Sequence, residues 1–213
     1  SPAMHIDDLR SYLAALEERG QLHRVTAPIE RDLELGHVAV LGERNAGPAL
    51  LFENVTGFEI PVLTSALTTS ERLAVVLGQE PGPGIPELSR LWVERLAAGL
   101  QPPRAVDQAP ILQNVLSGAD VDVTSLPSPR LYPEDGGRFF GTTAYLVVRH
   151  PESGWVNLGV YRMQELGPDR VAVQILRGKH ADMILEHYRE LGEAMPAAAI
   201  MGGDPLLFLA ASS

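Results

Sequence analysis

Two polar side chains interrupt the otherwise apolar stretch GWVNLGVYRMQ, residues 154–164, and are the first candidates for chemistry. Asn157 offers an amide, and Arg162 offers a planar, permanently charged guanidinium that can hold a carboxylate. The residues around them predict a strand. Because the two side chains are five positions apart, a regular strand points them to opposite faces, and they line one site only if the strand bends. The pattern alone favours two exposed strand residues.

Histidines and glycine turns are the next candidates. His180 and His187 are seven residues apart, so they share one face of a predicted helix. Histidine pairs that bind a metal from one helix normally have closer spacing, and this pair therefore favours surface histidines. The sequences EDGG at 134–137 and GGDP at 202–205 place glycines near acids. Neither has the strand-to-helix frame of a phosphate loop, so both are interpreted as turns.

Several common enzyme classes are excluded by what the chain lacks. It contains no cysteine, which rules out disulfides, thiolate metal sites and cysteine nucleophiles, and favours a cytoplasmic location. No Gly-x-Ser-x-Gly elbow, His-Glu-x-x-His helix or P-loop is present, which excludes the commonest types of hydrolase, zinc protease and NTPase. A net charge of −10 argues against nucleic acid or an anionic membrane as partners, and no apolar run is long enough for a membrane span.

The elements that must position these residues fall into two parts. The first part alternates helices and strands and predicts an α/β N-terminal domain over residues 1–105. Its helices are expected near 5–20, 33–42, 70–77 and 88–100, with strands within 22–30 and 48–67. Proline and glycine are dense around the last of these helices, which places the boundary near 102–110.

The second part, residues 106–213, predicts an antiparallel sheet or barrel with one inserted helix, His180–Leu191. Its predicted strands are 109–116, 141–150, 154–164 and 169–176, and a further apolar strand precedes the GGDP turn. The chain then ends within an apolar stretch, and the segment PLLFLA, residues 205–210, is expected to lack partners within the chain. We therefore expect a fragment of a longer protein, with some site residues beyond Ser213.

A resemblance adds what spacing cannot supply. Residues 126–164 and 176–205 resemble the UbiD family of reversible decarboxylases, which use prenylated FMN, and residues 7–25 and 49–67 resemble that family's N-terminal domain. The Asn-x-x-x-x-Arg element followed by Lys-His at a fixed distance carries the likeness. It implies an α/β N-terminal domain followed by part of a flavin-binding split β-barrel, α+β overall.

The resemblance also implies roles for individual residues. Asn157 and His180 match ligands of the divalent metal, usually Mn²⁺, that anchors the cofactor phosphate, and Arg162 matches the catalytic arginine beside the reacting centre. Lys179 matches a position close to the cofactor, and Ser212 and Ser213 fall in the segment that holds a monovalent cation such as K⁺. The residues matching the segment beside the flavin are Leu158, Gly159, Val160 and Tyr161. A hard divalent ion suits this role, because a phosphate needs compensation in an acidic protein.

The implied activity is non-oxidative decarboxylation of an α,β-unsaturated or aromatic carboxylic acid. The flavin acts as the electron sink, and a glutamic acid protonates the product. The resemblance also implies that a flavin prenyltransferase supplies the cofactor and that the enzyme is a homo-oligomer. The family's third metal ligand and its proton donors are glutamates expected beyond Ser213, so the fragment alone is expected to be inactive. Two alternatives stay open: an FMN-binding split-barrel oxidoreductase, which needs no divalent ion, and a non-catalytic binding or assembly domain.

Overall fold

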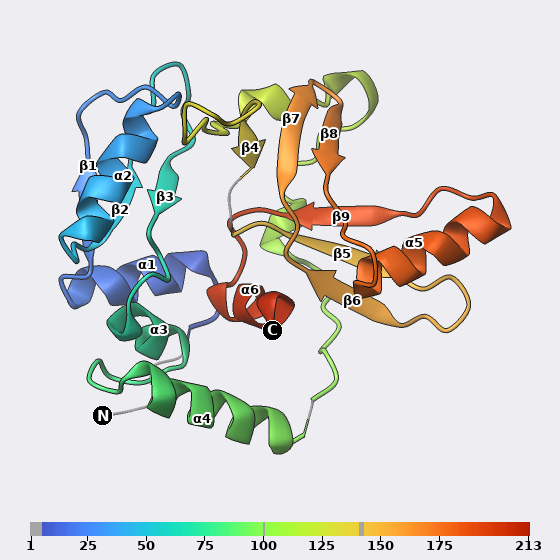
Figure 1. Cartoon of the computed structure of the whole chain (residues 1–213), viewed down its shortest axis with the longest axis horizontal. Coiled ribbons are helices and arrows are strands. Elements are labelled where there is room, and N and C mark those ends of the chain that lie inside the picture. Colours follow the sequence, from blue (N-terminus) through green and yellow to red (C-terminus); the bar gives the residue numbers. More distant parts are fainter. Residues whose placement is uncertain (1–5, 100, 141–142) are drawn as a thin grey trace.

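The computed structural model describes residues 6–99, 101–140 and 143–213. The N-terminal half holds one three-stranded sheet covered by helices (Figure 1), in which β1 runs parallel to β2 and β2 antiparallel to β3. Its elements are α1 (Leu9–Glu18), β1 (Leu22–Val25), α2 (Glu34–Arg44), β2 (Ala49–Phe52), β3 (Val62–Thr64), α3 (Ser70–Val76) and α4 (Ile85–Ala97). The predicted alternation of helices and strands in this half is confirmed.

The first core explains why α1 forms where the sequence predicts it. The Asp8 carboxylate accepts a hydrogen bond from the backbone N–H of Ser11 at 2.7 Å, which caps the free donors of the first turn. Tyr12 and Leu16, four positions apart, are fully buried against β2 and α3. Gly20 follows the helix at a φ of +64°, a conformation that glycine adopts without steric cost and that turns the chain into β1.

The second half contains two antiparallel three-stranded sheets, in the orders β4-β7-β8 and β6-β5-β9. Its elements are β4 (Phe139–Phe140), β5 (Tyr145–Arg149), β6 (Val156–Gly159), β7 (Met163–Gly167), β8 (Arg170–Val173), α5 (His180–Leu191), β9 (Ala197–Ile200) and α6 (Pro205–Ser212). Helix α5 packs on the β6-β5-β9 sheet through Ala181, Ile184 and Tyr188. The expected antiparallel pairing and the inserted helix are present, but the strands form two sheets where the sequence predicts a single sheet or barrel, and a second helix, α6, follows. The division of the chain at residue 105 stays a prediction.

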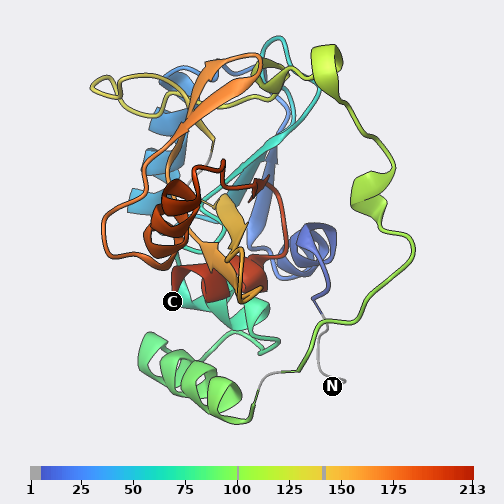
Figure 2. The same cartoon turned by 90° about the vertical axis from the view of Figure 1, so that its right-hand side faces the viewer.

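Two strand predictions are corrected. Residues 109–116 form no strand: only Pro110–Leu112 are regular, as a short 3-10 helix, and Ile111 and Leu112 are exposed on an extended connection that runs along one side of the molecule (Figure 2). Proline cannot donate to a strand ladder, and none of the sheets extends to this connection. The stretch 154–164 is two strands, because the chain leaves one sheet after Gly159 and enters the other at Met163.

Helix α6 corrects a third expectation, since the segment 205–210 has partners within the chain. The Asp204 side chain accepts from the Leu206 backbone N–H at 2.8 Å and Pro205 occupies the first turn, an arrangement that starts a helix. Leu206 and Leu209 pack against the core of the N-terminal half. Helix α6 also contacts β6, so it lies between the two halves (Figure 1).

A second contact joins the halves at the start of α2. The backbone N–H of Leu33 donates to the Arg130 carbonyl at 2.7 Å, and Arg138 forms a two-pronged ion pair with Asp32 at 2.9 and 2.8 Å. Gly36 lies so close to Leu131 that an added Cβ would come within 2.6 Å of the Leu131 carbonyl oxygen.

In the part of the chain that the structure describes, no helix is long and apolar enough to cross a membrane.

Candidate active site

Arg162 projects from the crossing between the two sheets, directly before β7 begins. Its Nη2 donates to the Asp135 carboxylate at 3.1 Å, and its Cζ lies 4.1 Å from the centroid of the Phe139 ring. The side chain is 50% exposed, so this pairing leaves part of the guanidinium accessible. An arginine held by a carboxylate and an aromatic face keeps a defined orientation while retaining free donors.

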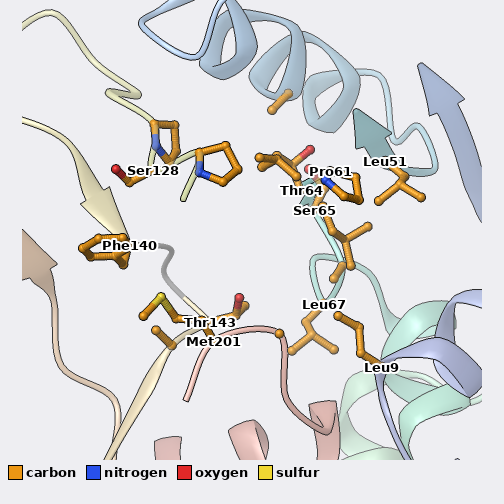
Figure 3. Close-up of a pocket in the computed structure, with 18 of the residues that line it drawn as sticks. Leu9, Leu51, Pro61, Thr64, Ser65, Leu67, Ser128, Phe140, Thr143 and Met201 are labelled. Carbon is orange, nitrogen blue, oxygen red and sulfur yellow. The ribbon is translucent and has the colours of Figure 1, made fainter. Parts of the chain in front are cut away.

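This guanidinium lines a cavity of about 600 Å³ between the two halves of the molecule. Figure 3 shows Leu51, Pro61 and Leu67 on one wall, and Ser128, Phe140 and Met201 on the other. Most of the lining is apolar, and Arg162 is the cationic side chain among its described residues. An apolar cavity with a few polar groups suits a small molecule that has an apolar body and an anionic end.

Asn157 lies away from this cavity lining, on β6 opposite Val148. The residue is 7% exposed, and its side-chain Nδ2 has no hydrogen-bond partner among the described residues. A buried amide group without a partner costs about 1–3 kcal/mol, so such a group indicates a ligand contact. Rotation of the amide about its last bond brings its oxygen to the same place, where it can bind a cation.

His180 begins α5 and is exposed, with its ring 5.1 Å from the Trp155 ring in an edge-to-face contact. The His150 N–H donates to the Trp155 carbonyl at 2.8 Å, which extends the β5–β6 ladder by one pair. Trp155 is two positions before Asn157, so both side chains share a face of this ladder. The structure therefore brings His180 to the side of β6 that carries Asn157.

The described residues do not by themselves complete a metal site. Within 6–99, 101–140 and 143–213, no group of three or more His, Asp or Glu side chains could hold a metal ion. His187 packs on His150 with ring centroids 4.6 Å apart and lies 3.3 Å from Glu152, so it does not share a site with His180.

The remaining candidates lie on β6, on the residues that follow it, before α5 and at the end of α6. Gly159 is buried, and a Cβ there would lie 2.4 Å from the Tyr161 ring, which itself packs against α5 in the second core. Leu158 and Val160 are half-buried, and Lys179 is exposed immediately before α5. The hydroxyls of Ser212 and Ser213 donate to the Leu209 and Ala210 carbonyls, each at 2.8 Å, where α6 ends.

Sequence reasoning missed Asp135 and Phe139, which hold Arg162. The sequence does show an acidic residue in the EDGG turn, but the pattern by itself indicates only a turn and gives no partner for that acid. A turn residue can be assigned to an arginine 27 positions later only when the pairing of β4 with β7 is known.

The comparisons with known proteins agree with this architecture. Two family models match the chain: the 3-octaprenyl-4-hydroxybenzoate carboxy-lyase N-terminal domain over residues 13–92, and the Rift-related domain of the same family over residues 104–213. The chain belongs to the UbiD family. The resemblance expected from the sequence is thereby confirmed, as is the mixed α/β fold class with the family's two domains.

Solved UbiD-class structures superimpose closely on this chain. Vanillic acid decarboxylase of Sedimentibacter hydroxybenzoicus in its closed form has a TM-score of 0.91 at 27% identity, over 97% of this chain and 45% of that one. HmfF of Pelotomaculum thermopropionicum in complex with FMN has a TM-score of 0.83 at 31% identity, over 96% and 44%. The apo 3,4-dihydroxybenzoic acid decarboxylase of Enterobacter cloacae has a TM-score of 0.85 at 25% identity, over 97% and 44%. This chain spans less than half the length of these relatives.

Proposed function

We propose that this chain forms part of a UbiD-type enzyme that removes CO₂ from an α,β-unsaturated or aromatic carboxylic acid, without oxidation and reversibly, using prenylated FMN. The observation that carries the proposal is Arg162, which presents a fixed, half-exposed guanidinium to an apolar cavity in a chain of this family. The apolar walls would accept the hydrocarbon part of the acid, and the guanidinium would hold its carboxylate.

The candidate cofactor residues fit a metal-bound phosphate. The proposal is supported by the buried Asn157 amide, whose Nδ2 has no partner among the described residues, and by the ring contact between His180 and Trp155, which precedes Asn157 by two positions. We assign Asn157 and His180 as ligands of a divalent ion such as Mn²⁺, which would compensate the phosphate charge. The acidic third ligand that the family resemblance implies belongs to the same proposal, and the described residues show no group of three such side chains.

The overall reaction balances without an oxidant or reductant. The bond between the carboxylate carbon and the neighbouring carbon breaks, CO₂ leaves, and the electron pair left on that neighbouring carbon takes up a proton. Prenylated FMN, when bound, supplies the electron sink for that pair. Arg162 would orient the carboxylate before the bond breaks, because its planar fork can hold both carboxylate oxygens.

The same proposal extends to partners. A flavin prenyltransferase would supply the cofactor, and a homo-oligomer is the assembly that we propose for the full-length protein. A dimeric form occurs among the relatives, as an evolved variant of HmfF in complex with prenylated FMN. Because these 213 residues span less than half the length of the UbiD-class structures they match, we propose that alone they would bind prenylated FMN weakly and would not turn over substrate.

The test is Arg162→Lys in the full-length protein loaded with prenylated FMN. A lysine keeps the charge but cannot replace the planar fork, so we expect the flavin to be retained while kcat/KM falls by about 100-fold or more. Arg170→Lys is the matched control, because Arg170 is an exposed strand arginine that pairs only loosely with Asp169. Wild-type turnover in the Arg162 variant would overturn the proposal.

A further inference from the structure

Asp135 is anchored at both carboxylate oxygens, although its side chain belongs to a surface turn. Oδ2 accepts from the Tyr132 backbone N–H at 3.1 Å, and Oδ1 accepts from Arg162 Nη2 at 3.1 Å. The Asp135 N–H also donates to the Tyr132 carbonyl at 3.1 Å, which closes the turn on itself. The side chain is only 12% exposed, so the ion pair with Arg162 is partly shielded from water.

The turn that carries Asp135 is fixed to the strand that follows Arg162. The Gly136 carbonyl accepts from Gln164 Nε2 at 3.2 Å, and Phe139 pairs with Gln164 in the β4–β7 ladder. At Gly137, a Cβ would come within 2.6 Å of the same Gln164 amide, so the absence of a side chain allows this close approach. Asp135 and Arg162 therefore sit on two segments whose relative position is set by a hydrogen-bonded ladder.

This geometry restricts the guanidinium without using all of its donors. Arginine has five N–H donors in a planar fork, and the structure pairs one of its terminal nitrogens with Asp135 and one face of its plane with Phe139. Among the described residues its Nε and Nη1 have no hydrogen-bond partner, so they are available to a second carboxylate in the cavity that Arg162 lines. A fixed guanidinium loses less conformational entropy when it binds substrate, and it presents its fork at one angle.

We propose that Asp135 is a positioning residue for Arg162: it sets the orientation of the guanidinium toward the substrate carboxylate and does not itself touch the substrate. The inference rests on the proposed function. Because Asp135 is itself negative, it also opposes a second carboxylate beside Arg162. Its removal should therefore impair orientation while leaving the electrostatic attraction for an acid intact or stronger.

The experiment compares Asp135→Asn, Asp135→Glu and Glu134→Gln in the full-length protein loaded with prenylated FMN. It measures kcat, KM, and the Kd of 3-phenylpropanoate, an acid that lacks the double bond. Misplacement of about 1 Å can cost 10²-fold in rate, so we expect kcat of Asp135→Asn to fall about 10- to 100-fold while KM and the Kd stay equal or decrease. Asp135→Glu should recover part of kcat. Glu134→Gln removes the neighbouring exposed charge and should stay within about twofold of wild type.

Three results would overturn the inference: kcat of Asp135→Asn within twofold of wild type, a loss of probe affinity as large as the loss of kcat, or an equal loss in Glu134→Gln. If Asp135→Asn does not fold, Asp135→Glu carries the test, because it keeps the charge and displaces the carboxylate. A lower kcat at unchanged Kd then supports the inference, and wild-type kcat overturns it. Arg162→Lys separates the two proposals: if it is inactive while Asp135→Asn is normal, only the positioning role fails.

Discussion

At the scale of single residues, burial separates side chains that the sequence presents as equals. Asn157 is buried, and its amide nitrogen has no partner in the part of the chain that the structure describes, whereas Asn45 and Asn54 donate through theirs to the Leu41 and Thr26 carbonyls. A buried polar group without a partner is tolerated where a ligand will satisfy it. This contrast supports Asn157 as a residue that contacts the metal or the phosphate.

His180→Ala tests the proposed metal site, to which Asn157 and His180 are assigned together. In the full-length protein, loss of one metal ligand should lower Mn²⁺ affinity by about 10-fold or more, because the remaining ligands compensate the phosphate charge poorly. Metal content after gel filtration, measured by inductively coupled plasma spectrometry, is the readout. His187→Ala is the matched control, since it removes a histidine from the same helix that packs elsewhere. Equal metal content in both variants would contradict the assignment.

A second residue-scale prediction concerns Asp204, the cap of α6. Burial raises the pKa of this carboxyl above its ordinary value of 3.8, and the nearby Asp7 and Asp8 raise it further. A carboxyl whose pKa is raised by folding favours the folded state most at low pH, and this contribution is lost as the pH rises through its folded pKa. Asparagine is an equally good cap. We therefore expect Asp204→Asn to gain stability relative to wild type as the pH rises above about 4.

Thermal unfolding of Asp204→Asn and of the wild-type protein from pH 3 to pH 8 measures how the difference in their stability changes with pH. Asp32→Asn serves as the opposite case, because the hydrogen bond from Arg138 lowers the pKa of the Asp32 carboxyl. Its stabilising contribution is present above its unfolded pKa and is lost as the pH falls through its folded pKa. Asp32→Asn should therefore cost stability at neutral pH and little in acid. A constant difference between Asp204→Asn and wild type across the pH range would refute the first expectation.

At the scale of elements, the break between β6 and β7 determines where Arg162 points. Gly159 ends β6 on the sheet shared with β5, and the Tyr161 ring folds back over it into the core beneath α5. The next residue, Arg162, is thereby directed away from that core and toward the cavity before Met163 enters the other sheet. The anchored tyrosine and the glycine beneath it are the physical cause of the crossing.

Gly159→Ala should disturb this crossing. The added methyl would lie 2.4 Å from the Tyr161 ring, which is 8% exposed and has little room to move. Overpacking of this kind typically costs about 1–3 kcal/mol of unfolding free energy. Urea denaturation measures it, with Gly136→Ala as the control because nothing lies within 4 Å of a Cβ there. If both variants unfold at the wild-type urea concentration, the crossing does not depend on Gly159.

At the scale of the whole molecule, the two halves are held together at two places that flank the cavity. The start of α2 meets residues 130–138 through backbone and ion-pair contacts, and α6 packs on the first core while it contacts β6. The cavity lined by Arg162 has walls from both halves, so its shape depends on how one half sits against the other. Substitutions at the junction should therefore act on the cavity as well as on stability.

Two glycines of α2 provide a matched test of the junction. A Cβ at Gly36 would meet the Leu131 carbonyl oxygen at 2.6 Å, whereas one at Gly42 would make only an ordinary contact with Leu50 at 3.5 Å. Alanine is favoured over glycine in a helix by about 1 kcal/mol, so Gly42→Ala should be neutral or stabilising. Gly36→Ala should instead cost about 1–3 kcal/mol, because backbone must move. Chemical denaturation of both variants measures the difference in their unfolding free energies. Equal unfolding free energies would show that the junction at Gly36 adjusts to the added methyl group.

The sequence by itself determined the local elements and the family. The helix predicted at His180–Leu191 has those bounds in the structure, and the capped α1 follows from Asp8, the apolar spacing and Gly20. Such features depend on neighbours within a few positions, where propensity, periodicity and capping act. The resemblance over both parts of the chain, which the family models confirm, rests on the order of residues alone.

Only the tertiary structure decided how those elements bring side chains together. It split 154–164 between two sheets, gave the apolar segment 205–210 partners in the other half, and paired Asp135 with Arg162. Each of these depends on contacts between residues far apart in sequence, which strand register and packing fix after the chain has closed. The apolar pattern of a strand continues unchanged across a break, since both sheets demand buried residues there. For that reason the crossing that directs Arg162 into the cavity could not be read from the sequence.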